Sequence, residues 1–460
     1  METNRTGAPP EKNSIITLEI TALGSEGEGV GRHGGFVVFV PFALPGERVE
    51  ARVIKVTSAY AVGKLLNVIK PSPDRIKPRC PAFGRCGGCQ LQHMEYPAQL
   101  AFKRNAVREA FRKIGGIEAD VLPVLGMDEP WRYRNKGIFP AGEAGGRLML
   151  GMYAPRSHNI VGVEDCPLQH EAAAGAMAAV RRWAAENKVP AYDEATGNGL
   201  IRAVMVRSFR ETGEAVAVLV TNGEALPAAG ALAEALQSAV PGLTGVVQNV
   251  NAERTNVVLG YREKVLWGST RVKARLGELR YDVAAASFFQ VNSEQMAKLY
   301  EAAADAAALT GRELVVDAYC GVGTIGQYMA RRAARVVGIE SVPASVEEAR
   351  LSAARNGIVN AEYVCGRAED VLHDMAQKGV RPDVIVMDPP RKGCDRKFLD
   401  AAAASGAGKM VYVSCNPATM ARDARILLDM GYTLGPVRPV DMFPQTAEVE
   451  CVALLSYIER

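Results

Sequence analysis

The sequence predicts an α/β protein in which a carboxy-terminal, doubly wound parallel sheet follows a small amino-terminal β-barrel and a central α+β unit. Apolar strands alternate with helical segments after residue 299, and short β-rich runs separated by Gly and Pro fill residues 14–70. Helices and strands are mixed between these two regions. A chain of 460 residues is long enough for about three domains. We therefore divide it into residues 10–72, 73–280 and 281–460.

The composition, 48% hydrophobic and 23% charged, is typical of a folded globular protein. No apolar run reaches the roughly 18 residues of a membrane-spanning helix, and the first seven residues have no apolar core of the signal-peptide kind. We therefore expect a cytoplasmic protein. Its nine cysteines are then better interpreted as metal ligands, catalytic thiols or buried residues than as disulfides. A net charge of +3 is too small to identify a nucleic-acid partner.

The individual elements follow from residue patterns. In the first unit, β-rich runs that alternate with Gly and Pro turns predict barrel strands at residues 15–20, 35–40 and 48–55. In the central unit we expect helices at 99–114, 171–186 and 225–239, and strands at 200–208, 215–221 and 245–250. In the last unit the strands are 314–317, 336–340, 384–388 and 409–414, and their alternation with helices predicts parallel pairing.

A cofactor site is predicted at the carboxyl edge of this parallel sheet. The first strand runs through Asp317 into a turn with Gly321 and Gly323, where glycine lets the backbone approach a ligand. Glu340 ends the next strand, where a carboxylate can accept hydrogen bonds from ribose hydroxyls, and Asp388 ends a third. A nicotinamide dinucleotide would require a glycine directly after the first strand. The interposed acid instead favours a methyltransferase, because the methionine amino group of the methyl donor needs an anionic partner.

Cys415 follows the strand at 409–414 and reaches the same edge, which makes it a candidate nucleophile; the alternative is a small buried residue. Uracil C5 is a poor nucleophile, and addition of a thiolate to C6 activates it for methylation. A base must afterwards remove the C5 proton. Glu450, at the start of a late strand, is the candidate base. Glu448 is its alternative, because strand alternation points both side chains the same way.

Several segments in order resemble the uracil-C5 RNA methyltransferase family, specifically its 23S ribosomal RNA branch with an amino-terminal TRAM domain and an iron-sulfur cluster. They are Ser287-Phe-Phe-Gln-Val-Asn292, Asp317-Ala-Tyr-Cys-Gly-Val-Gly-Thr324, Asp388-Pro-Pro-Arg-Lys-Gly393 and Val413-Ser-Cys-Asn-Pro417. The resemblance implies a TRAM, OB-like barrel and a Rossmann-like methyltransferase domain. It also implies S-adenosylmethionine contacts from Gln290, Tyr319, Glu340 and Asp388, the nucleophile Cys415 and the base Glu450.

The chain departs from this family pattern at two positions. Glu448 stands where the family often has His. Arg367 follows Gly366 where an acidic residue is frequent, which leaves the adenine-side contact unassigned.

Four further cysteines have the spacing of a metal centre. Cys80, Cys86 and Cys89 form a C-x5-C-x2-C triplet, and Cys166 lies downstream before a proline. Zinc or a cubane cluster would suit four thiolates. Three close cysteines and a distant one before Pro favour a [4Fe-4S] cluster, and the resemblance matches these positions. Methyl transfer needs no electron, so we expect a structural role, with a redox sensor as the alternative.

The expected partner is RNA, because a uridine must be flipped out of its stack to reach Cys415. The cluster and barrel favour 23S ribosomal RNA and we expect a monomer. A transfer-RNA uracil-C5 methyltransferase shares all the chemistry. An exocyclic-amine methyltransferase that uses Asp-Pro-Pro would not need Cys415. A non-catalytic iron-sulfur RNA-binding protein would transfer no methyl group.

Overall fold

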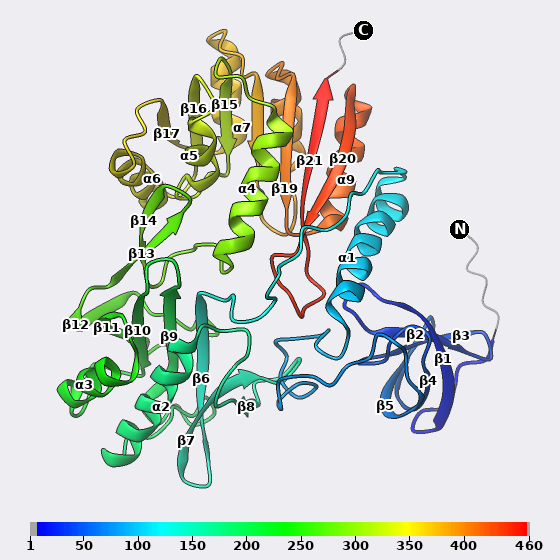
Figure 1. Cartoon of the computed structure of the whole chain (residues 1–460), viewed down its shortest axis with the longest axis vertical. Coiled ribbons are helices and arrows are strands. Elements are labelled where there is room, and N and C mark those ends of the chain that lie inside the picture. Colours follow the sequence, from blue (N-terminus) through cyan, green and yellow to red (C-terminus); the bar gives the residue numbers. More distant parts are fainter. Residues whose placement is uncertain (1–6, 458–460) are drawn as a thin grey trace.

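The computed structural model describes residues 7–457. Figure 1 shows a β-barrel at the lower right, a sheet with two helices at the lower left and a larger sheet with helices above them. The segment after the barrel runs between all three parts. In the described range no helix is long and apolar enough to cross a membrane.

The amino-terminal barrel is closed, with strand order β1-β2-β3-β5-β4. Closing the sheet into a barrel leaves no strand edge with unpaired backbone groups and encloses the apolar face of the sheet. Buried and exposed residues alternate along β1, so that Ile16, Leu18 and Ile20 pack inside against Val38 and Val40. The strands are β1 (Ile15–Leu23), β2 (Gly29–His33), β3 (Phe36–Val40), β4 (Arg48–Val56) and β5 (Ala61–Lys70).

The segment after the barrel has irregular structure through its first three cysteines and then forms α1 (Tyr96–Ala110). A helix over 99–114 was expected, but the last turn is a π-helix, Phe111–Gly115. It packs against α9, where a side-chain carbon at Gly115 would lie 2.9 Å from the Ala421 carbonyl oxygen. Val121 and Leu125 then pair with the carboxy-terminal strand β20. This segment therefore packs on the third unit.

The central sheet has seven strands in the order β12-β11-β10-β9-β6-β7-β8. Its strands are β6 (Lys136–Ala144), β7 (Arg147–Tyr153), β8 (Ile160–Gly162), β9 (Ile201–Phe209), β10 (Glu214–Thr221), β11 (Leu243–Val250) and β12 (Arg262–Gly268). Helices α2 (Glu171–Glu186) and α3 (Ala229–Ala239) pack on it through Trp183, Leu232 and Leu236. A hairpin of β13 (Arg271–Leu276) and β14 (Leu279–Ala284) follows, and its apolar face joins the central sheet and the last unit in one continuous core.

The carboxy-terminal sheet also has seven strands, in the order β17-β16-β15-β18-β19-β21-β20. Its strands are β15 (Leu314–Ala318), β16 (Arg335–Glu340), β17 (Ala361–Cys365), β18 (Val384–Met387), β19 (Lys409–Ser414), β20 (Tyr432–Val440) and β21 (Glu450–Tyr457). The first five are parallel, as expected. At one end of the sheet β21 inserts antiparallel between β19 and β20, a pairing that the sequence pattern did not predict.

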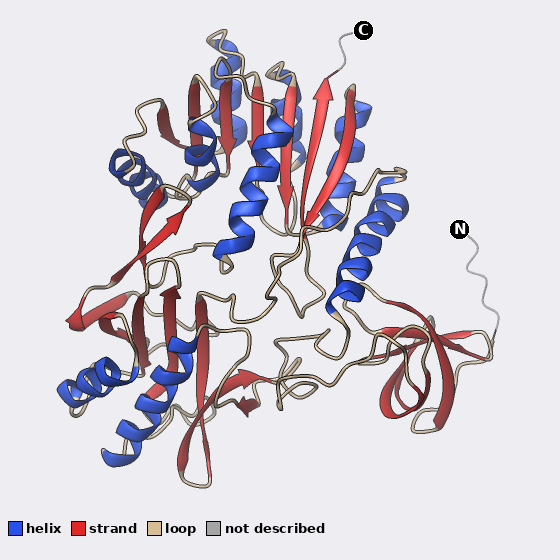
Figure 2. Ribbon diagram, viewed as in Figure 1, coloured by secondary structure: helices blue, strands red, loops and turns tan. Residues whose placement is uncertain are grey.

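Helices cover both faces of this sheet (Figure 2). Val315 and Val316 point to opposite faces, as successive strand residues must. The Val315 face packs on α4 and α5, and the Val316 face on α1, α7, α8 and α9. These helices are α4 (Ser293–Ala307), α5 (Thr324–Ala330), α6 (Pro343–Arg355), α7 (Ala368–Gln377), α8 (Arg396–Ala404) and α9 (Pro417–Asp429). Layers on both faces leave the strand ends as the open edge for a site.

Candidate active site

The glycine-rich turn after β15 is built around a buried carboxylate. Asp317 Oδ2 accepts a hydrogen bond of 2.8 Å from the Gly326 N–H. Oδ1 is buried and has no hydrogen-bond partner among residues 7–457. Burial raises the pKa of Asp317 to about 7, and nearby Asp388 and Glu340 add to the increase. A buried, unpaired carboxylate oxygen gains from binding a cationic group.

Glu340 closes the other side of this turn. One of its oxygens accepts a hydrogen bond from the Gly321 N–H at 3.1 Å, and the other accepts from the Val342 N–H at 2.8 Å. Tyr319, inside the turn, has a left-handed backbone with φ of 64°, and its ring packs against Phe398 of α8 with the ring centroids 5.0 Å apart. Gln290 is half-buried before α4, and its carbonyl oxygen accepts a hydrogen bond from Asn135.

Cys415 and Glu450 lie opposite each other across two antiparallel strands. Ser414, the last residue of β19, pairs with Cys451 of β21, so Cys415 directly after β19 comes opposite Glu450 directly before Cys451, and the Glu450 charge acts on the Cys415 thiol. Cys415 is half-buried, whereas Glu450 is only 4% exposed. Asp388 follows β18, the parallel neighbour of β19. The sheet thus brings together the three groups that the sequence placed at its edge.

Burial and mutual repulsion favour the protonated forms of this group. Burial raises the pKa of Glu450 to about 8, with further increases from Asp388 and Glu448. Burial raises the pKa of Asp388 to about 7. The pKa of the Cys415 thiol rises to about 11, first through burial and then through Glu450 and Asp388. Arg391 opposes the increases at both Glu450 and Cys415.

Glu448 and Glu450 have different environments. The Glu448 side chain is 45% exposed and its Oε1 lies 3.0 Å from Nη2 of Arg391, whereas Glu450 is buried next to Cys415. Strand β21 begins only at Glu450, so the alternation rule does not extend back to Glu448. The structure therefore distinguishes two carboxylates that the sequence could not.

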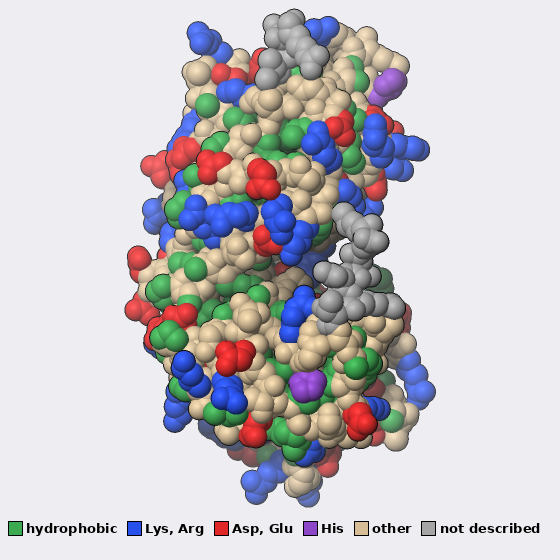
Figure 3. All heavy atoms as spheres, turned by 90° about the vertical axis from the view of Figure 1, so that its right-hand side faces the viewer, with side chains coloured by type: hydrophobic (Ala, Val, Ile, Leu, Met, Phe, Trp, Pro, Cys, Tyr) green, Lys and Arg blue, Asp and Glu red, His purple; other side chains and the backbone are tan. Residues whose placement is uncertain are grey.

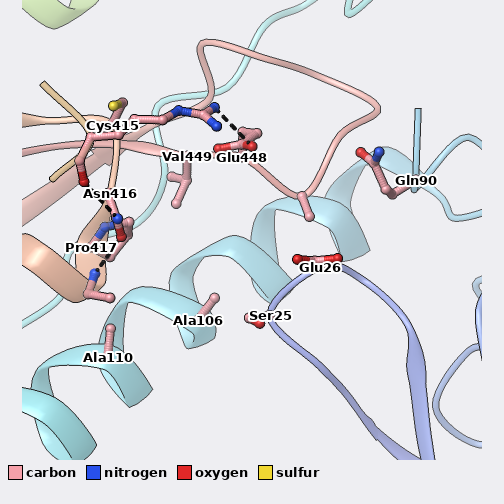
Figure 4. A pocket seen from close by; sticks show the side chains of 13 residues that line it. Ser25, Glu26, Gln90, Ala106, Ala110, Cys415, Asn416, Pro417, Glu448 and Val449 are labelled. Carbon is pink, nitrogen blue, oxygen red and sulfur yellow. Dashed lines mark hydrogen bonds and ion pairs between the residues drawn. The ribbon is translucent and has the colours of Figure 1, made fainter. Parts of the chain in front are cut away.

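A cavity of about 520 Å³ opens in front of Cys415. Figure 4 shows Ser25 and Glu26, at the tip of the β1–β2 hairpin of the barrel, across from Cys415 and Asn416. The hairpin approaches the rest of the chain closely, because a side-chain carbon at Gly27 would lie 2.8 Å from Cδ2 of Leu91. The barrel therefore forms part of the wall of the cavity that contains the candidate nucleophile.

The loop between β20 and β21, residues 441–449, is held by the segment that follows the first cysteines. The backbone N–H groups of Gln90 and Leu91 both donate to the Gln445 carbonyl oxygen, at 3.1 and 3.0 Å. The Gln99 side chain accepts from the Gln445 N–H at 3.1 Å and donates to Oε1 of Gln445 at 3.0 Å. These bonds fix the loop that leads into Glu450.

The four cysteines of the predicted metal centre line one cavity of about 140 Å³. Gln92 links two of them, since its Oε1 accepts from the Cys80 N–H at 3.1 Å and its Nε2 donates to Cys89 Sγ at 3.2 Å. Burial raises the pKa of Cys89 to about 12, and the Cys166 thiol adds to the increase. Within residues 7–457, no three metal-ligating side chains converge on a single ion position.

Sequence reasoning missed several residues of this site. Gln99 and Gln445 are 346 positions apart, and neither has a local signal. Arg367 pairs with Glu369 in the first turn of α7, and the Glu369 side chain is largely buried. Glu369 thus places an acidic side chain three positions after Gly366, in the first turn of α7.

Comparisons with known proteins agree with this architecture. The family model described as tRNA (Uracil-5-)-methyltransferase matches residues 246–458, and the TRAM domain matches residues 9–66. The chain is 46% identical to an uncharacterized RNA methyltransferase of Halalkalibacterium halodurans over 97% of this chain and 98% of the relative. The chain belongs to the RNA methyltransferase family. An uncharacterized RNA methyltransferase of Clostridium acetobutylicum is 41% identical over 98% of this methyltransferase and 99% of its own length.

The fold comparison extends over almost the entire methyltransferase. The crystal structure of a Pyrococcus abyssi tRNA (uracil-54, C5)-methyltransferase in complex with S-adenosyl-L-homocysteine matches with a TM-score of 0.77 and 27% identity. The match covers 95% of this chain and 99% of that one. The predicted barrel, methyltransferase fold and enzyme class are confirmed, and the non-catalytic alternative is not supported.

Proposed function

We propose that this methyltransferase transfers a methyl group from S-adenosylmethionine to C5 of a uridine in 23S ribosomal RNA. The placement of Cys415 opposite Glu450, at the edge that carries the buried acids, is the observation that supports this most strongly. An exocyclic-amine methyltransferase would have no use for a thiol at that point. We keep the functional division into residues 10–72, 73–280 and 281–460, and a cytoplasmic location, as parts of the same proposal.

The acidic edge fits the cofactor. S-adenosylmethionine supplies an electrophilic methyl group on a sulfonium, and it carries a cationic amino group and ribose hydroxyls. Asp317, with its unpaired buried oxygen, suits the cationic end. Glu340 can accept hydrogen bonds from ribose hydroxyls. Gln290, Tyr319 and Asp388 are the remaining proposed contacts. The Pyrococcus relative contains S-adenosyl-L-homocysteine, which supports this assignment.

Two residues of the chain carry out the proposed chemistry. The Cys415 thiolate forms a bond to uracil C6, which shifts the electron pair of the C5=C6 bond to C5 for attack on the methyl group. The bond between that methyl group and the sulfonium sulfur breaks, and its electron pair stays on the sulfur, which leaves as the neutral thioether. Glu450 then takes the proton from C5 as its carboxylate form. The electrons of that C–H bond re-form the C5=C6 double bond, and the C6–S bond breaks to release the thiolate.

RNA engagement follows from the position of the cavity. Cys415 is half-buried and lines a cavity that the barrel hairpin also lines, so a uridine must leave its stack to reach it. Figure 3 looks at the side on which α1 and the barrel lie, and Lys and Arg side chains gather across the middle of that face. Such side chains suit an RNA backbone. We propose that a monomer binds a flipped-out uridine.

A transfer-RNA substrate is the second candidate. The solved Pyrococcus relative is a tRNA (uracil-54, C5)-methyltransferase, and the matching family model has a tRNA name. The four-cysteine segment together with the barrel is our reason to place ribosomal RNA first. Competition between the two RNAs for one enzyme preparation decides between them.

We also propose that Cys80, Cys86, Cys89 and Cys166 hold a [4Fe-4S] cluster. The four thiols line one cavity, and the spacing of three close cysteines with a distant one before Pro favours a cluster over zinc. Anaerobic purification followed by iron and acid-labile sulfide analysis tests this, with Cys166→Ala expected to lose both. Cys365→Ser serves as the matched control, because Cys365 is an exposed thiol outside the cavity. Stoichiometric zinc without sulfide would contradict the proposal.

The decisive experiment for the activity uses 5-fluorouridine RNA, because fluorine at C5 blocks the final proton removal. We expect a denaturant-stable protein–RNA adduct with 23S ribosomal RNA for the wild type and for Cys365→Ser, and none for Cys415→Ala. Methylation of ordinary RNA without an adduct would overturn the covalent mechanism. An adduct with transfer RNA alone would move the substrate to the second candidate.

A further inference from the structure

Arg391 is an exposed cation. Its backbone is held by a hydrogen bond, and its side chain forms an ion pair with a single carboxylate among residues 7–457. The Asn416 Nδ2 donates to the Arg391 carbonyl oxygen at 3.0 Å, which ties this backbone to the residue after Cys415. The Arg391 side chain is 70% exposed, and among residues 7–457 its only ion-pair partner is Glu448. The guanidinium thus pairs with Glu448 and lines the same cavity as Cys415, and its charge lowers the pKa of the Cys415 thiol.

An exposed arginine side chain has high conformational entropy and does not stay at one point without a partner. Without Glu448, Arg391 would extend into the open cavity, where water solvates it. The Cys415 thiol would then face only Glu450 and Asp388, two acids that oppose its ionisation. Thiolate formation next to two acids requires a cation held nearby.

We propose that Glu448 is a positioning residue whose ion pair holds the Arg391 guanidinium beside the Cys415 sulfur and thereby keeps the thiol reactive. This inference rests on the proposed role of Cys415 as nucleophile. It gives a function to the chain's departure from the family pattern: a neutral His at position 448 could not form this ion pair.

The charged groups around the thiol define what Glu448 does. Glu450 of β21 and Asp388 after β18 raise the pKa of Cys415, whereas Arg391 lowers it. Glu448 acts directly on Glu450, whose pKa it raises. On this proposal Glu448 acts on Cys415 through the position of Arg391, so that loss of the Glu448 charge should make the thiol less acidic. Simple repulsion between Glu448 and the thiolate would predict the opposite result, a more acidic Cys415 thiol after Glu448 is removed.

The test measures the alkylation rate of Cys415 by iodoacetamide between pH 6.5 and 10, in protein free of RNA. Cleavage after Lys409 and Arg422 gives a peptide in which Cys415 is the only cysteine, so mass spectrometry follows this thiol alone. We expect Glu448→Gln to slow alkylation at pH 8 by about twofold to fivefold, the range that a partly exposed ion pair supplies. Arg391→Gln should slow it at least as much, and Glu448→Asp should restore part of the rate.

Two further variants make the result specific. The double variant Glu448→Gln with Arg391→Gln should be alkylated no more slowly than Arg391→Gln alone, because both substitutions abolish the same ion pair. Asp395→Asn is the matched control: it frees Lys392 in the same loop, where the two form an ion pair of 3.3 Å, and should leave alkylation unchanged. An unchanged or faster rate in Glu448→Gln would overturn the inference. Because alkylation needs no methyl transfer, failure of the proposed function, seen as an active Cys415→Ala variant, is a separate outcome.

Discussion

Lys103 of α1 and Asp441, at the start of the 441–449 loop, form an ion pair in which neither side chain has any exposed surface. Tyr96 of the same helix donates to the other Asp441 oxygen at 2.7 Å, and Lys103 also donates to the Phe443 carbonyl oxygen at 3.0 Å. Burial lowers the pKa of Lys103, and Asp441 opposes that shift. Helix α1, which follows the barrel and the first cysteines, is therefore joined to the loop that leads to Glu450.

Breaking this pair should destabilise the protein strongly. Lys103→Met leaves the Asp441 carboxylate buried without its cation, which costs about 3–5 kcal/mol in the free energy of unfolding. Thermal unfolding followed by circular dichroism measures the change. Lys113→Met is the control, because Lys113 forms an exposed pair with Glu109 and its loss should leave the melting temperature unchanged. A small effect of Lys103→Met would show that Tyr96 alone can satisfy Asp441.

The pH profile should rise through neutral pH. Glu450 has a pKa raised to about 8 and must lose its proton to act as a base. Cys415 has a pKa raised to about 11 and must also ionise. Below pH 8 both groups are protonated in the free enzyme, so kcat/KM should rise by about tenfold or more for each pH unit. RNA affinity measured over the same range separates ionisation from binding. A profile that is flat from pH 6 to 8 would contradict these roles.

Glu450→Gln should trap an intermediate on ordinary uridine. Without a base the methylated ring keeps its C5 proton, and elimination of Cys415 is blocked. We expect a denaturant-stable adduct that contains the transferred methyl group, while turnover falls by about 10²–10⁴. Radiolabelled methyl donor and denaturing electrophoresis detect it. If Glu448 were the base instead, Glu448→Gln would accumulate the adduct and Glu450→Gln would not.

Loss of the Gln99 amide should loosen the 441–449 loop. Gln99→Ala removes two hydrogen bonds to Gln445, each worth about 1 kcal/mol. Hydrogen exchange in residues 441–449 should become faster, and kcat should fall while RNA affinity changes little. Gln237→Ala on α3 should match the wild type, because within residues 7–457 the Gln237 side chain forms hydrogen bonds only in its own helix. Unchanged exchange in the loop would mean that its other contacts, including those from Gln90, Leu91 and Lys103, hold it without Gln99.

The regular elements were predictable where a local pattern determines them. The helix expected at 171–186 is α2 with the same bounds, and the strand expected at 409–414 is β19. The spacing of apolar residues, together with Gly and Pro at the ends of elements, determines the type and bounds of such an element from a short stretch of sequence. The π-helix at the end of α1 was not predictable, because it depends on the close approach of α9 at Gly115.

The sequence predicted which reactive side chains lie at the candidate site, but not the strand pairing and long-range contacts that hold them in place. Strand ends in a parallel sheet meet at one edge, so Asp317, Glu340, Asp388 and Cys415 could be placed together. The antiparallel insertion of β21 was missed, because it depends on pairing between distant segments. The separation of Glu448 from Glu450 depends on where β21 begins, and the anchoring of the 441–449 loop by Gln99 and Lys103 spans over 300 residues.

The hairpin that carries Ser25 and Glu26 sets a limit on how this enzyme can be rebuilt. Because these two residues line the cavity that contains Cys415, the barrel cannot simply be replaced by another RNA-binding domain. A chimera that exchanged residues 10–72 for another RNA-binding module would lose Ser25 and Glu26 and leave the cavity of Cys415 open on one side, however well the new module bound its ligand. Retargeting to a different RNA would have to preserve the hairpin while the outer strands of the barrel vary.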